Sequence, residues 1–159
     1  KMDLKPMDID LVELTKQLLG DWQDRLSESG LRIITDLPED TSTVYVDGKA
    51  TSRILDNILG NVSKYALADS RVYIEIKQDD ESKMSCLTIK NTSRDEIFQT
   101  ADELISRFSK GDSARSGEGN GLGLAIAKNF TELMGGTFKI TVDGDLFKTE
   151  IALPNSNKI

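Results

Sequence analysis

The chain is organised around residues 117–128, which read Gly117-Glu-Gly-Asn-Gly-Leu-Gly-Leu-Ala-Ile-Ala-Lys128. The four glycines of this stretch stand at alternate positions, so the backbone can adopt positive φ angles and its N–H groups can approach a ligand without a Cβ atom in the way. Apolar residues at helical spacing follow directly, and they predict an amphipathic helix that begins where the glycines end. Exposed N–H groups and the positive end of a helix dipole both favour phosphate, so the stretch predicts an anion-binding loop.

Glycine-rich loops occur in many folds, and an ordinary surface loop is the alternative interpretation. The spacing of the glycines excludes several nucleotide-binding classes. It contains no G-x-G-x-x-G, the fingerprint of dinucleotide-binding folds and of the protein-kinase glycine loop, and no G-x-x-x-x-G-K-[ST], the Walker A loop. A different nucleotide-binding fold is therefore required.

Composition narrows the functions further. The 159 residues carry a formal net charge of −7 with acids and bases interspersed, which disfavours nucleic acid as a partner. The chain contains no histidine, so any histidine chemistry must come from a partner. One cysteine, Cys86, cannot form an internal disulfide and favours a reducing, cytoplasmic setting. No apolar run approaches the roughly 18 residues of a membrane span, so no direct membrane contact is expected.

Hydrophobic periodicity predicts an α/β fold. The expected helices cover 10–29, 49–67 and the residues after the glycines, and the expected strands cover 31–35, 44–46, 71–77, 84–90, 137–142 and 146–153. This order predicts a two-layer sandwich, in which helices cover one face of a mixed β-sheet. Residues 91–119 form a long polar connection with one short apolar patch, and a connection of this length in a compact domain is typical of a lid.

The predicted helix 49–67 carries a polar stripe beside its apolar one. Asn57, Asn61, Lys64 and Tyr65 share this stripe at the border of the core. Amide oxygens are suitable ligands for Mg²⁺, which shares the phosphates of its nucleotide. Lys64 could supply charge to a phosphate, and Tyr65 could supply an aromatic wall. The alternative is that these side chains are polar surface residues of an exposed helix.

Three motifs in register make a resemblance specific. Residues 53–65 resemble the N box of sensor histidine kinases, 107–116 resemble their F box, and 117–128 resemble their G2 box. The chain thus resembles the catalytic and ATP-binding (HATPase) domain of sensor histidine kinases, within the superfamily that includes DNA gyrase, Hsp90 and MutL. The fold that the resemblance implies is the Bergerat-type α/β sandwich with a long ATP lid.

The resemblance implies a role for each matching position. Asn61, assisted by Asn57, would hold Mg²⁺ against the triphosphate of ATP. Lys64 would contact the phosphates, and Lys110 would approach the γ-phosphate, so these four residues are the expected catalytic set. The other expected contacts are Tyr65 against the adenine, Phe108 as the anchor of the lid, Leu122 at the hinge of the lid, and Gly119, Gly121 and Gly123 close to the phosphates.

One departure from the family pattern affects recognition of the base. Related domains usually have Asp-x-Gly where this chain has Asn91-Thr-Ser93, and the Asp accepts a hydrogen bond from the adenine amino group. The amide oxygen of Asn91 can accept the same bond, but without the charge that strengthens it. We therefore expect ATP affinity to be retained but weakened.

The resemblance also implies the partners. Histidine kinases transfer the γ-phosphoryl group to a histidine on a separate dimerisation domain, and then to a response regulator. We expect residues 1–9 to be the junction after a missing dimerisation domain, 10–154 the catalytic domain, and 155–159 a C-terminal tail.

Two other functions stay open. One is a stand-alone ATPase or serine kinase of the same superfamily. The ATPases generally place a glutamate one helical turn before the metal-binding Asn, where this chain has Asn57, and an amide cannot take a proton from water. The other is a domain that has lost catalysis and serves as a regulatory binding module, which the altered Asn91 region favours.

Overall fold

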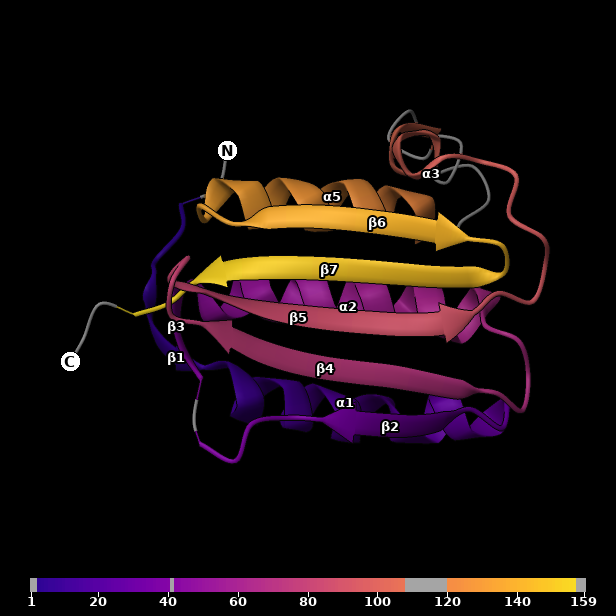
Figure 1. Cartoon of the computed structure of the whole chain (residues 1–159), viewed down its shortest axis with the longest axis horizontal. Coiled ribbons are helices and arrows are strands. Elements are labelled where there is room, and N and C mark those ends of the chain that lie inside the picture. The colour runs from indigo at the N-terminus through magenta and orange to yellow at the C-terminus, as the bar shows by residue number, and fades with distance from the viewer. Residues whose placement is uncertain (1–2, 41, 108–119, 157–159) are drawn as a thin grey trace.

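The computed structural model describes residues 3–40, 42–107 and 120–156. A five-stranded sheet forms one layer, and three helices lie behind it in Figure 1. The strands in spatial order are β2 (Arg32–Asp36), β4 (Arg71–Asp79), β5 (Met84–Thr92), β7 (Leu146–Pro154) and β6 (Thr137–Asp143). Strand β2 runs parallel to β4, and the other neighbours are antiparallel. The prediction of a two-layer α/β sandwich with a mixed sheet is confirmed.

Helix α2 (Gly48–Tyr65) is the centre of the helical layer, with α1 (Leu11–Glu28) and α5 (Asn120–Leu133) in contact with it. Its apolar residues recur at three and four positions, so they form one stripe that turns toward the sheet. The buried members of that stripe are Ile54, Leu55, Ile58, Leu59 and Val62. They join the inward residues of β4, β5 and β7 in one hydrophobic core. The sequence predicted α1 and α2 to within two residues. The third helix was expected to begin where the glycines end, but α5 begins at Asn120 and includes Gly121 and Gly123.

Two elements were not predicted. Strand β1 (Met7–Asp10) pairs antiparallel with β3 (Thr43–Val46) in a small second sheet. Helix α3 (Ala101–Arg107) lies inside the segment expected to be a polar lid, and it contacts α5 and β6. Figure 1 shows β1 and β3 at one end of the main sheet and α3 at the other.

Helix α3 begins with a reciprocal capping box that the sequence carries as Thr100-Ala-Asp-Glu103. The hydroxyl of Thr100 accepts a hydrogen bond from the Glu103 N–H at 3.2 Å, and the Glu103 carboxylate accepts one from the Thr100 N–H at 2.9 Å. Two N–H groups that a helix start leaves without partners are thereby satisfied. This signal could have predicted the helix.

Asp47 fixes the start of α2. Its carboxylate accepts a hydrogen bond from the Ala50 N–H at 2.9 Å and another from the Lys5 N–H at 2.8 Å. Hydrogen bonds from the backbone of Lys5 and Ala50 lower the pKa of Asp47 below its usual value. One side chain thus caps the helix that carries the polar stripe and also holds the segment before β1.

Replacing Asp47 with alanine is expected to lower the free energy of unfolding by about 1 to 2 kcal/mol, because the helix loses its cap. Asp47→Asn, which keeps an acceptor oxygen, should lose less than about half of that amount. The folded-state pKa lies below the unfolded value of about 3.8. The carboxylate therefore stabilises the fold above that pH, and its contribution is lost as the pH falls through the folded-state pKa.

Urea unfolding of both variants beside the wild type, at pH 7 and near pH 3, measures these differences. An equal loss for Asp47→Asn and Asp47→Ala at pH 7 would show that the cap is not the cause.

Candidate functional site

A pocket of about 250 Å³ opens where the C-terminal half of α2, the ends of β5 and β7, and the segment 93–99 meet. Helices α3 and α5 close another side of it with one leucine each, Leu104 and Leu124. Most of the exposed wall is apolar, with a few polar groups at its edges, as is usual for small-molecule sites. The residues that line it are Asn61, Val62, Tyr65, Asn91, Ser93, Asp95, Glu96, Ile97, Gln99, Leu104, Leu124 and Phe147.

Asn61 presents an amide oxygen for which the described structure supplies no partner. The side chain is only 8% exposed and lies on the pocket wall. Its Oδ1 atom is buried and accepts no hydrogen bond from any described residue. A buried acceptor left in this state costs about 1 to 3 kcal/mol, so an orphaned oxygen on a pocket wall indicates a ligand that satisfies it. An amide oxygen is also a suitable ligand for Mg²⁺, so the residue fits the ion expected from the sequence.

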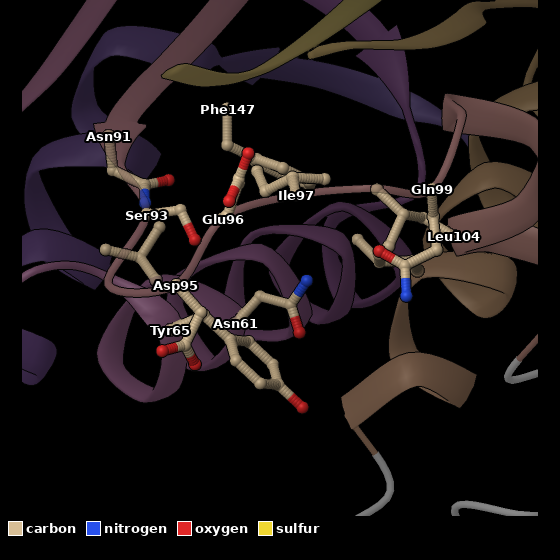
Figure 2. Close-up of a pocket in the computed structure, with 12 residues that line it drawn as sticks. Asn61, Tyr65, Asn91, Ser93, Asp95, Glu96, Ile97, Gln99, Leu104 and Phe147 are labelled. Atoms are coloured by element: carbon tan, nitrogen blue, oxygen red, sulfur yellow. The ribbon is translucent and has the colours of Figure 1, made fainter. Parts of the chain in front are cut away.

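Asn91 forms another polar corner of the pocket, at the end of β5. It is 4% exposed and lies opposite Phe147 of β7 in the sheet register. Its Nδ2 donates a long hydrogen bond of 3.3 Å to the carbonyl of Thr92. Figure 2 shows the amide nitrogen on the side of Ser93 and the amide oxygen facing the pocket. The oxygen is therefore placed to accept a hydrogen bond from a ligand.

The segment after β5 is held to both neighbouring elements by its backbone. The Arg94 N–H donates to the carbonyl of Tyr65 at 2.7 Å, and the Ser93 N–H donates to that of Asp145 at 2.7 Å. The Leu67 N–H donates to Thr92 at 2.8 Å. These bonds tie the segment to the end of α2 and to the β6–β7 turn, so the backbone of this wall is held by hydrogen bonds within the chain.

Tyr65 closes the pocket at the end of α2. Its side chain is 38% exposed and lines the cavity, as Figure 2 shows. Apolar partners from four other parts of the chain face the same space: Ile97, Leu104, Leu124 and Phe147. A planar aromatic ligand would find one ring and several aliphatic walls here.

Asn57 and Lys64 are not among the described residues that line the pocket. The Asn57 amide donates a hydrogen bond of 3.1 Å to the carbonyl of Gly123, in the first turns of α5. A Cβ atom on Gly123 would lie 3.4 Å from the Cβ of Asn57, which is ordinary van der Waals contact, so the two helices are in close contact at this point. Lys64 is half-buried in the last turn of α2.

The remaining predicted site residues lie at or beyond the edge of the described structure. Gly121 and Leu122 belong to the first turn of α5, directly before Gly123. Phe108, Lys110 and Gly119 lie outside the described residues.

The segment 93–99 supplies Ser93, which belongs to the altered Asp-x-Gly position, and four pocket residues that the sequence did not indicate. These four are Asp95, Glu96, Ile97 and Gln99. Asp95 is close to its neighbour Arg94, with 3.5 Å between Oδ2 and Nε, and both side chains are well exposed. The unusual length of the connection and its Thr-x-x-Glu signal were the available indications that this segment is ordered against the site.

Comparisons with known proteins identify the family of the chain. The model of a family described as histidine kinase-, DNA gyrase B-, and HSP90-like ATPase matches residues 46–156. The sensor protein kinase WalK of Staphylococcus aureus is 30% identical over 132 residues, which cover 81% of this chain and 32% of that protein. WalK of the JH9 strain is matched over 22% of its length. The chain therefore spans about a third or less of the curated relatives that it matches.

Solved structures share the fold. The Acinetobacter baumannii histidine kinase AdeS superposes with a TM-score of 0.78 at 21% identity, covering 98% of this chain and 70% of that one. Full-length ShkA in complex with AMPPNP gives 0.80 at 21% identity, over 99% of this chain and 32% of that one. The catalytic domain of the histidine kinase ThkA gives 0.79 at 14% identity, over 97% and 99%.

No helix in the described ranges is long and apolar enough to span a membrane. The family model covers most of the chain, and the structural matches extend over nearly all of it. The chain belongs to the family of histidine kinase-, DNA gyrase B- and HSP90-like ATPases, and the curated relatives that it matches are sensor protein kinases.

Proposed function

We propose that this chain is the ATP-binding catalytic domain of a two-component sensor histidine kinase. In this function it presents the γ-phosphate of Mg²⁺-ATP to a histidine on a dimerisation domain, for onward transfer to a response-regulator aspartate. The domain would work in the cytoplasm, in a parent protein that can itself be anchored in the membrane. The observation that carries the proposal is the buried, unpartnered Oδ1 of Asn61 on the wall of the pocket.

Asn61 is the residue that would hold Mg²⁺, with Asn57 assisting one helical turn earlier. When bound, the ion supplies positive charge that neutralises the phosphates. Asn57 would act by positioning as well, because its amide joins α2 to the glycine-bearing start of α5. Lys64 and Lys110 would add charge around the phosphates.

The rest of the site would bind and enclose the nucleotide. Tyr65 and Asn91 would contact the base, which the apolar walls of the pocket would shield from water. The backbone of Gly119, Gly121 and Gly123 would pass close to the phosphates, at the positive end of α5. Phe108 and Leu122 would control closure of the lid. Phosphoryl transfer needs mainly such positioning and charge neutralisation.

A transfer assay tests the proposed reaction. The chain is incubated with Mg²⁺, ATP labelled at the γ-phosphate, and the histidine-bearing dimerisation domain of a sensor kinase such as the Staphylococcus relative. Acid-labile, alkali-stable label on that domain, and none when its histidine is replaced by glutamine, is the expected result. Label on serine, release of free phosphate without transfer, or ATP binding without either reaction would favour the ATPase, serine kinase or regulatory module instead.

An aspartate at position 91, at the end of the pocket where the adenine base would bind, is expected to strengthen ATP binding. Asn91→Asp should lower the Kd for ATP several-fold, up to about tenfold, because a charged acceptor forms a stronger hydrogen bond with an amino group. Calorimetric titration measures the change. Gln78→Glu, which adds the same charge at an exposed position of β4, is the matched control. Equal ATP affinity for the wild type and Asn91→Asp would contradict this account of the departure.

A further inference from the structure

An amide and a carboxylate lie at the end of the pocket where the nucleotide base would bind. Asn91 at the end of β5 and Glu96 in the following segment both line the cavity. Figure 2 shows them, with Phe147, at the end of the pocket away from Leu104 and Gln99. Both groups can form directional hydrogen bonds with the edge of a heterocycle.

The amide of Asn91 can present either a donor or an acceptor. With Oδ1 facing the pocket, it accepts a hydrogen bond from an exocyclic amino group such as that of adenine. A half-turn about χ2 would present Nδ2, which donates to a carbonyl such as O6 of guanine. That turn gives up the 3.3 Å hydrogen bond from Nδ2 to the Thr92 carbonyl, which is longer than the usual range, and places the amide oxygen beside that carbonyl instead. The bond to guanine must offset this contact between two acceptors. A carboxylate at this position could only accept.

Glu96 adds an acceptor that suits guanine better than adenine. The N1–H and the 2-amino group of guanine are adjacent donors, and one carboxylate can accept from both. Adenine has an acceptor at N1, which a carboxylate repels. Asp95 is engaged with Arg94, whereas Glu96 has no ion-pair partner within the described part of the chain. Glu96 is thus the carboxylate available to the base.

We propose that the pocket accepts guanine as well as adenine nucleotides, with Asn91 and Glu96 as the residues that determine this relaxed specificity. The inference rests on the proposed nucleotide-binding function and deepens it. Asn91 serves both bases by turning its amide, and Glu96 adds affinity for the base that carries two neighbouring donors.

Titration calorimetry with the magnesium complexes of ATP, GTP and ITP tests the proposal. The wild type should bind GTP with a Kd within about tenfold of that for ATP, and ITP more weakly than GTP, because ITP lacks the 2-amino group. Glu96→Gln should lower the GTP-to-ATP affinity ratio by about tenfold, since the charged acceptor is lost. Glu81→Gln, an exposed change in the β4–β5 turn, should leave the ratio as in the wild type.

The nucleotide series separates this inference from the proposed function. ATP binding with GTP more than about tenfold weaker overturns the relaxed specificity and leaves the ATP site standing. Absence of binding by all three nucleotides overturns both. If GTP and ITP bind equally, or Glu96→Gln leaves the ratio unchanged, the role of Glu96 is wrong. The comparison of GTP with ITP needs no variant, so it holds even if Glu96→Gln fails to fold.

Discussion

Replacing Asn61 with alanine is expected to weaken Mg²⁺-dependent ATP binding by at least about 100-fold. The Oδ1 atom of this residue is buried and accepts no hydrogen bond from the described residues, and the residue lines the pocket. The proposed function uses it to hold the ion that joins the protein to the triphosphate. Removing it takes away a bond made only in the nucleotide complex, so the loss should fall on binding and not on folding.

The free energy of unfolding without nucleotide should therefore change by less than about 1 kcal/mol, because an unsatisfied buried acceptor disappears together with some packing. Thr15→Val is the matched control. The Thr15 hydroxyl of α1 is the other buried side-chain oxygen without a partner in the described structure, and Thr15 is not among the pocket residues. Calorimetry and urea unfolding of both variants make the comparison. Tight ATP binding by Asn61→Ala, or equal losses for both variants, would remove Asn61 from the site.

The second large effect concerns the turn after α5. Gly136→Ala is expected to lower the free energy of unfolding by about 3 kcal/mol or more. The Gly136 N–H donates to the Thr131 carbonyl, and the N–H of Gly135, which has φ of 84°, donates to that of Glu132. These bonds form a Schellman motif that ends the helix. A Cβ atom on Gly136 would lie 2.1 Å from the carbonyl oxygen of Ala152 in β7. This oxygen belongs to the backbone of a strand, so it cannot move away at low energetic cost.

Gly20→Ala is the control for the effect of adding a methyl group. Gly20 lies within α1, and its Cβ position has no other atom within 4 Å. That substitution should raise stability by about 0.5 to 1 kcal/mol, because alanine favours the helical state. Thermal and urea unfolding should show a lower free energy of unfolding for Gly136→Ala and a higher one for Gly20→Ala. A Gly136→Ala protein as stable as the wild type would mean that the turn after α5 does not lie against the Ala152 carbonyl of β7.

Local patterns predicted most of the architecture. Helices α1 and α2 each carry an apolar stripe, and apolar residues alternate along β4 and β5. Each pattern predicts the element and the face that it turns toward the core. Strand β1 escaped prediction because its four residues are largely exposed, and its existence depends on pairing with β3, about 35 residues away in sequence. Helix α3 escaped because a seven-residue helix has little periodicity, although its capping box was legible.

The site was predictable in part for a related reason. Asn61 and Tyr65 belong to one helical stripe, so their spacing placed both beside the core, and the pocket contains both. Asn57 belongs to the same stripe, but it contacts Gly123 of α5 and does not line the pocket. Helical spacing predicts the direction in which a side chain points, but not which residue lies there. Glu96 and Phe147 come together only through the course of a loop and the register of β7, which no local pattern encodes.

A calorimetric titration of the wild-type chain with ATP, once in excess Mg²⁺ and once in EDTA, tests the Mg²⁺-ATP site most directly. We expect saturable binding in Mg²⁺ and binding at least about tenfold weaker in EDTA, because the nucleotide would reach Asn61 through the ion. Circular dichroism of the same samples confirms that the chain is folded. Equal binding in both buffers would contradict the role of the ion, and no binding to the folded chain at millimolar ATP would contradict the nucleotide site itself.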